Sequence, residues 1–233
     1  LGAAAGDVIG APYERHPCRN PNFPLFSPYS HFTDDTVLTV AVADAILHAE
    51  TYAEKILEYA RRYPDAGYGG SFYKWMESAN PKPYNSFGNG SAMRASAVGW
   101  AFDGVEEVLA AAERSAAATH NHPEGIKGAQ AVALAVFLAR TGSNKEVIRD
   151  EITSRMGYDL SRSLEEIAED YEWDVTCQRS VPESIIAFLE SHDFESAVRN
   201  AILLRGDADT MAAIAGSIAE AFYGGVPEAI ADE

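Results

Sequence analysis

Residues 123–142 read PEGIKGAQAVALAVFLARTG, and this stretch decides the fold class. Pro123 suits the first turn of a helix, where the backbone N–H has no partner, and Gly142 suits the residue after its end. Between them the stretch is rich in alanine, the strongest helix former, whose small side chain also lets helices pack closely. The stretch therefore predicts a helix over 123–140 that packs against other helices.

Most of the remaining chain follows the same pattern. Thr33 and Thr51 are suitable caps for the helices that follow them, and Ser163 with Glu166 matches a capping box. Alternating apolar and polar runs, which mark strands, are almost absent. The sequence predicts an all-α fold, a compact multi-helix globule. The expected helices cover 34–48, 52–63, 105–119, 123–140, the segment after Ser163, 182–190, 194–204 and 211–223.

Two stretches do not read as helix. Residues 14–31 contain four prolines, and residues 67–93 are rich in glycine, proline, tyrosine and asparagine. Prolines at that density exclude a helix interior, and long loops in a small domain are often functional. No internal repeat or low-complexity linker divides the chain, so residues 1–233 are expected to form one domain.

The composition excludes several classes of function. The chain of 233 residues has 18 Lys and Arg against 35 Asp and Glu, a net charge of −17. An acidic chain is a poor partner for duplex DNA, and no apolar run is long enough for a membrane span. Cys18 and Cys177 form no metal-binding or disulfide pattern, and residues 1–10 do not resemble a signal peptide. We expect a cytoplasmic protein, a monomer because no apolar stripe is evident, that binds neither DNA nor membrane.

Two acidic clusters each precede an apolar helix. They read TDDT at 33–36 and GDADT at 206–210. Either one alone is typical of a helix cap, because Asp and Thr accept hydrogen bonds from the first backbone N–H groups. Brought together, four carboxylates would repel one another and raise each other's pKa. A hard divalent cation removes this repulsion, and an all-oxygen ligand set suits Mg²⁺ or Mn²⁺.

Three further segments contain candidate catalytic or ligand-binding residues. GDVIGAPYE at 6–14 predicts an apolar helix that ends at a glycine-rich bend and presents Glu14; the alternative is a surface glutamate. SFGNGSAMR at 86–94 would let backbone N–H groups approach a phosphate, although Asn-Gly is also an ordinary turn. His120 follows an alanine-rich helix, and a histidine there is more often a helix C-terminal cap or a packed imidazole than a catalyst.

These motifs, in this order between Gly2 and Gly225, resemble the ADP-ribosylglycohydrolase family. That family includes the dinitrogenase reductase activating glycohydrolases and the ADP-ribosyl-acceptor hydrolases. The resemblance rests on GDVIGAPYE, FTDDT, SFGNGSAMR, the Thr-His pair before a Pro-started helix, and GDADT followed by AAIAGSIAEAFYG. It implies an all-α fold and a metal-dependent hydrolase that cleaves the glycosidic bond at ribose C1″ between ADP-ribose and an acceptor. It also implies two Mg²⁺ or Mn²⁺ ions.

The resemblance assigns roles by matching positions. The implied metal ligands are Thr33, Asp34, Asp35, Asp207, Asp209 and Thr210. The implied substrate-binding residues are Ser86, Phe87, Gly88, Asn89 and His120, which would hold the diphosphate and distal ribose. Glu14, Asp34 and Asp209 are the catalytic candidates, with Glu14 or a ligand aspartate accepting a proton from the attacking water. Arg205 stands where the family usually has glycine, and its guanidinium could pair with a carboxylate, reach the substrate or point away.

Three other functions remain open at this stage: an ADP-ribose-binding module, a crystallin-like structural protein of the same fold, and a hydrolase of another nucleoside conjugate. The sequence does not identify the acceptor group that is joined to ADP-ribose. The residues that select this group are expected in 14–31, 67–84 and 170–179. The aromatic residues in or beside these segments could stack on adenine or pack against the core. They are Tyr68, Tyr73, Tyr84, Trp75 and Trp173.

Overall fold

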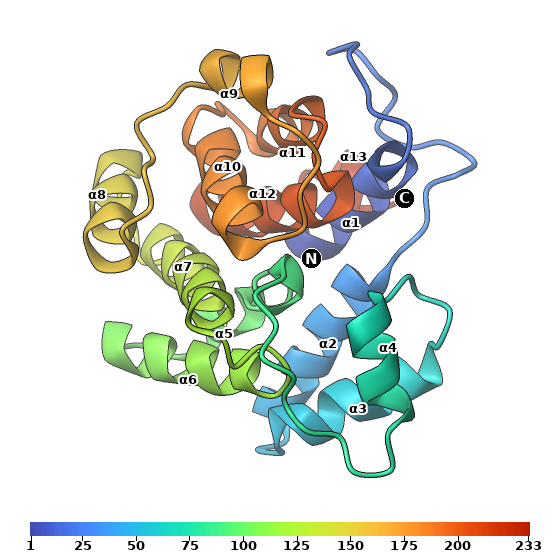
Figure 1. Cartoon of the computed structure of the whole chain (residues 1–233). Coiled ribbons are helices and arrows are strands. Elements are labelled where there is room, and N and C mark those ends of the chain that lie inside the picture. Colours follow the sequence, from blue (N-terminus) through green and yellow to red (C-terminus); the bar gives the residue numbers. More distant parts are fainter.

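The computed structural model describes all residues 1–233, and it contains helices but no sheet (Figure 1). The all-α prediction is confirmed. An isolated bridge between Gly88 and Thr176 is the one β-type pairing. The helices are α1 (Gly2–Glu14), α2 (Asp34–Leu47), α3 (Tyr52–Arg62), α4 (Gly70–Glu77), η1 (Asn89–Ser91, a 3₁₀ turn), α5 (Ser96–Ala101), α6 (Val105–Ala117), α7 (Pro123–Arg140), α8 (Lys145–Met156), α9 (Leu164–Asp170), α10 (Cys177–Leu189), α11 (Phe194–Leu203), α12 (Ala208–Tyr223) and α13 (Glu228–Ala231).

Helices α7 and α12 form the centre of the molecule. Both are buried along most of their length, and they pack against each other and against α10. Helices α1 and α11 cover α12, while α5 and α6 cover α7 (Figure 1). One continuous cluster of 59 buried apolar residues joins these layers. No helix combines the length and the apolar character that crossing a membrane requires.

The close contact of α1 with α12 depends on glycines spaced four residues apart on one face. A Cβ added at Gly6 would lie 2.1 Å from the Ala212 carbonyl oxygen, and one at Gly10 would lie 2.6 Å from that of Ala208. The prediction that the helix ends at a glycine-rich bend before Glu14 is therefore wrong. The helix continues through Pro12, and the glycines serve helix packing instead of a turn.

The segment 67–93 is only partly a loop. Residues 70–77 form α4, whose Phe72, Trp75 and Met76 are buried at helical spacing. The flanking glycines and prolines hid this short helix from sequence reasoning.

Other element boundaries also differ from the expectation. Helix α10 begins at Cys177, five residues before Pro182, which lies inside the helix. Helix α12 begins at Ala208 instead of Met211. Helix α8 was missed, although Asn144 caps its start and Gly157 ends it in the left-handed conformation.

Candidate active site

A cavity of about 1290 Å³ opens where the C-terminal end of α1 meets the N-terminal ends of α2 and α12. All six expected metal ligands line it, and so does Glu14. Of the five expected substrate-binding residues, four line it: Ser86, Gly88, Asn89 and His120. Phe87 does not, because its ring is half exposed and lies against His122, with ring centroids 5.3 Å apart.

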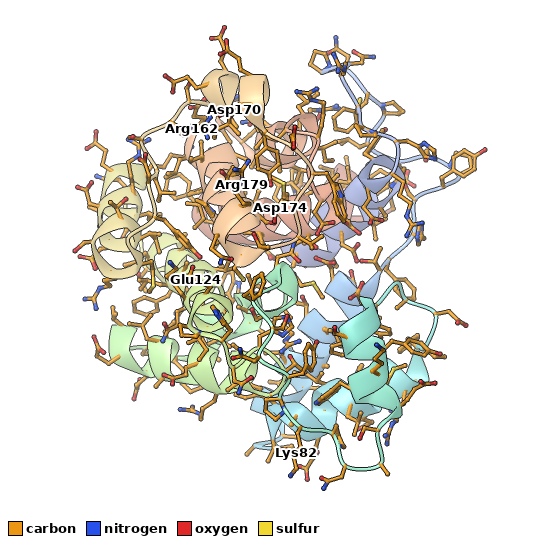
Figure 2. The ribbon with its side chains drawn as sticks, viewed as in Figure 1. Lys82, Glu124, Arg162, Asp170, Asp174 and Arg179 are labelled. Carbon is orange, nitrogen blue, oxygen red and sulfur yellow. The ribbon has the colours of Figure 1, made fainter.

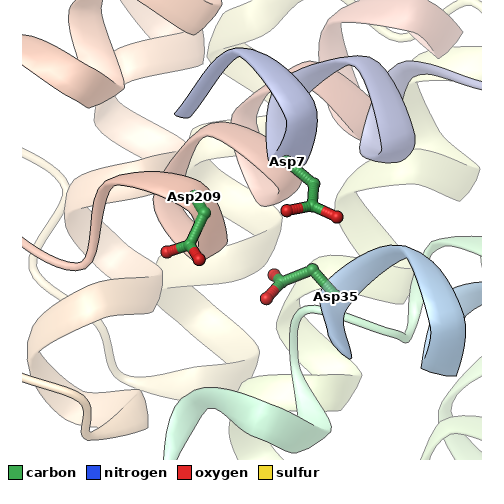
Figure 3. Close-up of side chains that lie close together, drawn as sticks. All are labelled: Asp7, Asp35 and Asp209. Carbon is green, nitrogen blue, oxygen red and sulfur yellow. The ribbon is translucent and has the colours of Figure 1, made fainter. Parts of the chain in front are cut away.

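Three buried carboxylates from three helices converge at the edge of the cavity, which Asp35 and Asp209 line. Asp7 of α1, Asp35 of α2 and Asp209 of α12 each offer an oxygen, and these oxygens lie within 4.8 Å of one another (Figure 3). Asp35 and Asp209 were expected there as metal ligands, and each stands in the first turn of its helix. The fold thus brings together two clusters that are 174 positions apart in the sequence, measured from Asp35 to Asp209.

Asp7 is the residue that sequence reasoning missed. Its Oδ1 accepts the Thr33 hydroxyl at 2.8 Å, and its Oδ2 accepts the Thr33 backbone N–H at 2.9 Å and the Thr36 backbone N–H at 3.1 Å. The Thr36 hydroxyl also donates to Oδ2. Three of these bonds go to Oδ2 and one to Oδ1, so Asp7 orients the start of α2 and keeps one lone pair on Oδ1. The available signal was a charged residue inside the apolar run of α1.

The arrangement fits a hard cation. Asp35 Oδ1 is buried and has no hydrogen-bond partner, while Oδ2 accepts the hydroxyls of Thr33 at 3.3 Å and Thr210 at 3.2 Å. Burial, and then the neighbouring carboxylate of Asp209, raise the pKa of Asp35 well above its usual range. A carboxylate oxygen that has no hydrogen-bond partner and lies among other oxygen atoms is a suitable ligand for a divalent cation.

Two further carboxylates at the cavity have raised pKa values. Burial raises the pKa of Asp34 to about 7, and the charges of Asp7, Asp207 and Glu14 add to this effect. Burial, followed by the charge of Asp207, also raises the pKa of Glu14, the last residue of α1. Both groups therefore suit proton transfer nearer neutral pH than an ordinary carboxylate.

The Ser86–Asn89 loop is held in place by the segment before α10. Its backbone pairs with the segment before α10: the Asn89 N–H donates to the Val175 carbonyl at 2.8 Å and the Cys177 N–H to the Phe87 carbonyl at 2.9 Å. Asp174 lies in that segment (Figure 2), and its side chain accepts the Thr176 N–H at 2.6 Å. The loop is therefore a fixed part of the cavity wall.

Arg205 points away from the carboxylates. Its guanidinium Nη2 donates to the Ala168 carbonyl of α9 at 2.7 Å, and Arg205 does not line the cavity. Its backbone has φ +66°, the left-handed conformation that favours glycine. The unusual arginine thus belongs to the scaffold, and of the three alternatives left open the structure selects the third.

The aromatic residues divide into two groups. Tyr68, Tyr84 and the half-exposed Trp173 line the cavity, whereas Tyr73 and the buried Trp75 do not. Tyr68 stacks on Phe72 at a centroid distance of 4.9 Å, and its hydroxyl is buried without a partner.

Comparison with known proteins agrees with this geometry. Residues 1–233 match the family ADP-ribosylglycohydrolase. The ADP-ribosylhydrolase ARH3 of Mus musculus is 31% identical, with 96% of this chain and 82% of the relative aligned, and that of Homo sapiens is 28% identical, with 96% and 84% aligned. A solved structure described as an ADP-ribosylglycohydrolase-related protein complex superposes with a TM-score of 0.76 at 26% identity, covering 99% of this chain and 88% of the other. The chain therefore belongs to the ADP-ribosylglycohydrolase family, and it is a glycosyl hydrolase.

Proposed function

We propose that residues 1–233 form a single catalytic domain that hydrolyses the glycosidic bond at ribose C1″ between ADP-ribose and an acceptor, with two Mg²⁺ or Mn²⁺ ions. The observation that carries the proposal is the unpartnered, buried Oδ1 of Asp35 beside Asp209 at a cavity of about 1290 Å³. A cavity of this size accommodates a dinucleotide-like ligand.

The proposed metal ligands come from the N-terminal ends of α2 and α12. They are Thr33, Asp34, Asp35, Asp207, Asp209 and Thr210. Bound divalent ions would supply Lewis acidity toward the ribose hydroxyls and water. Asp7 orients Thr33 and Thr36 from behind these ligands, mainly through Oδ2, while its Oδ1 accepts the Thr33 hydroxyl alone.

The remaining chemistry belongs to the carboxylates of the chain. Cleavage at C1″ passes through an oxocarbenium-like transition state, which nearby negative charge stabilises. Glu14 lies at the cavity with a raised pKa and is our candidate for accepting a proton from the attacking water. Asp34 and Asp209 are the other catalytic candidates.

The diphosphate would bind at the Ser86–Asn89 loop and His120. A chain of net charge −17 needs local donors for an anion. The Asn89 amide and the backbone N–H groups of Gly88 and Asn89 already donate within the protein, so the candidate donors are the backbone N–H groups of Ser86 and Phe87, the Ser86 hydroxyl and His120. The bridge to Val175 and Cys177 supports this role, because it fixes the loop before a ligand arrives.

The first test is release of ADP-ribose from arginine-, serine- and acetyl-linked substrates with Mg²⁺, with Mn²⁺ and with EDTA. Metal-dependent release from one linkage supports the proposal and names the acceptor. The Asp209→Ala variant should release none and bind the metal more weakly. Tight ADP-ribose binding without any release would contradict it and indicate a hydrolase of another conjugate. The monomeric state and the cytoplasmic location stay predictions.

A further inference from the structure

A fully buried arginine lies beside His120 at the cavity. Arg94 has no exposed surface, yet it lines the cavity wall. Its Nη2 donates to the Ser115 carbonyl at 3.2 Å and to the Thr119 hydroxyl at 2.9 Å, which uses both Nη2 hydrogens. Burial lowers the pKa of Arg94 to about 10, so the guanidinium stays charged at neutral pH. A guanidinium has no acceptor, so toward Thr119 it acts only as a donor.

The Thr119 hydroxyl stands between Arg94 and the imidazole of His120. Its Oγ1 lies 2.6 Å from His120 Nδ1, and these two groups are its only hydrogen-bond partners. Oγ1 has one proton and two lone pairs, and Arg94 takes one of these lone pairs. Nδ1 is the one remaining partner, so the hydroxyl proton is satisfied only when it is donated to Nδ1. The nitrogen Nδ1 can accept this bond only when it carries no proton.

The imidazole is neutral at neutral pH. Burial, and then the charge of Arg94, lower the pKa of His120 well below its usual range. A neutral imidazole whose Nδ1 accepts must carry its proton on Nε2. A Cβ added at Gly90 would lie 3.3 Å from Nε2, and one at Gly88 would lie 3.7 Å from it. The Nε2 edge therefore lies beside the glycine turn at the cavity wall.

We propose that Arg94 and Thr119 are positioning residues that hold His120 as the Nε2–H tautomer, so that an N–H donor faces an anionic substrate group at the Gly88–Gly90 turn. The inference rests on the proposed function, in which that group is the diphosphate of ADP-ribose. In the opposite, Nδ1–H tautomer, Oγ1 would accept from both Arg94 and Nδ1, and its own buried proton would have no acceptor. The Nε2 lone pair would then repel the anion.

The first measurement is nitrogen-15 NMR of the histidine rings in the ligand-free wild-type protein, with His120→Gln used to assign the His120 signals. A protonated Nε2 and an unprotonated Nδ1 are expected. A protonated Nδ1 overturns the proposal. This measurement needs no substrate, so it stands whether or not the enzyme acts on ADP-ribose.

The second measurement is ADP-ribose affinity by titration calorimetry. Thr119→Val should weaken binding about tenfold, since a hydrogen bond to a charged group is affected. Thr119→Ser keeps the hydroxyl and should bind like wild type. In steady-state assays Thr119→Val should raise KM and leave kcat unchanged, because the diphosphate is remote from the bond that is cleaved.

A double-mutant cycle separates positioning from a general effect on folding. Glutamine at 120 offers an amide N–H near the position of Nε2 that does not depend on Thr119. In the His120→Gln background, Thr119→Val should therefore cause no further loss of affinity. An equal loss in both backgrounds would show a structural role and overturn the proposal. Wild-type protein that binds no ADP-ribose would contradict the proposed function, while the tautomer result would still decide this inference.

Discussion

The side-chain amide of Asn89 donates a 2.7 Å hydrogen bond to Oδ2 of Asp207. The bond joins the loop proposed to hold the diphosphate to the first aspartate of the second acidic cluster. A second bond, from the same amide to the Ser180 hydroxyl at 3.2 Å, holds the amide in this orientation. Asn89 thus connects the substrate loop to a proposed metal ligand.

Replacing Asn89 by alanine should weaken metal binding. Loss of a hydrogen bond that orients a ligand typically costs about 10- to 100-fold in metal affinity. The concentration of Mn²⁺ that gives half-maximal activity should rise accordingly. Asn200→Ala is the matched control, because its amide donates to the Ala187 carbonyl at 3.1 Å, outside the cavity lining. An unchanged metal requirement in Asn89→Ala would show that this bond does not position Asp207.

The metal-free protein should lose stability as the pH rises. Burial raises the folded-state pKa of Asp34 to about 7 and also raises that of Asp35. In the unfolded chain an aspartate titrates near about 3.9. The folded state therefore binds more protons between these values, and the free energy of unfolding falls as the pH rises from about 4 to about 7.

Thermal unfolding in EDTA across this pH range checks the expectation. Added Mn²⁺ should raise the unfolding temperature most at the high end, because the ion binds the deprotonated carboxylates. A metal-free protein whose stability is flat or rises through this window would contradict the raised pKa values.

Helix capping was readable from the sequence because it is local. The Thr33 side chain accepts the Asp35 N–H at 3.2 Å, and Ser163 forms the expected capping box with Glu166. The role of Asp7 was not readable, because its partners lie on α2 and meet it only when α1 and α2 pack together. The amide bond from Asn89 to Asp207 is of the same kind, since 118 positions separate the two residues.

Gly6→Ala should destabilise the fold by about 1–3 kcal/mol, because its Cβ would lie 2.1 Å from the Ala212 carbonyl oxygen and force α1 away from α12. Gly70→Ala is the control, since nothing lies within 4 Å of its added Cβ. Urea denaturation of both variants measures the difference. Equal stability of the two variants would mean that α1 can shift at no cost.

Arg205→Gly should leave activity intact. Glycine relieves the cost of the left-handed backbone, about 1–2 kcal/mol, and loses the bond to the Ala168 carbonyl, about 0.5–1.5 kcal/mol. These effects oppose each other, so the free energy of unfolding should change by about 1 kcal/mol or less. Urea denaturation and kcat measured together check this. A folded variant with reduced kcat would show that Arg205 acts on the site from a distance.

Glu14→Gln should lower kcat by about 10²- to 10⁴-fold, the usual contribution of a general base. The variant should still bind metal, because Glu14 lies at the end of α1 and is not among the proposed ligands. Asp209→Ala provides the contrast, since it should lose activity and metal affinity together. Titration calorimetry with the metal distinguishes the two variants by their metal affinity. Full turnover by Glu14→Gln would remove Glu14 from the mechanism and leave Asp34, whose pKa of about 7 also suits a proton acceptor, as the candidate base.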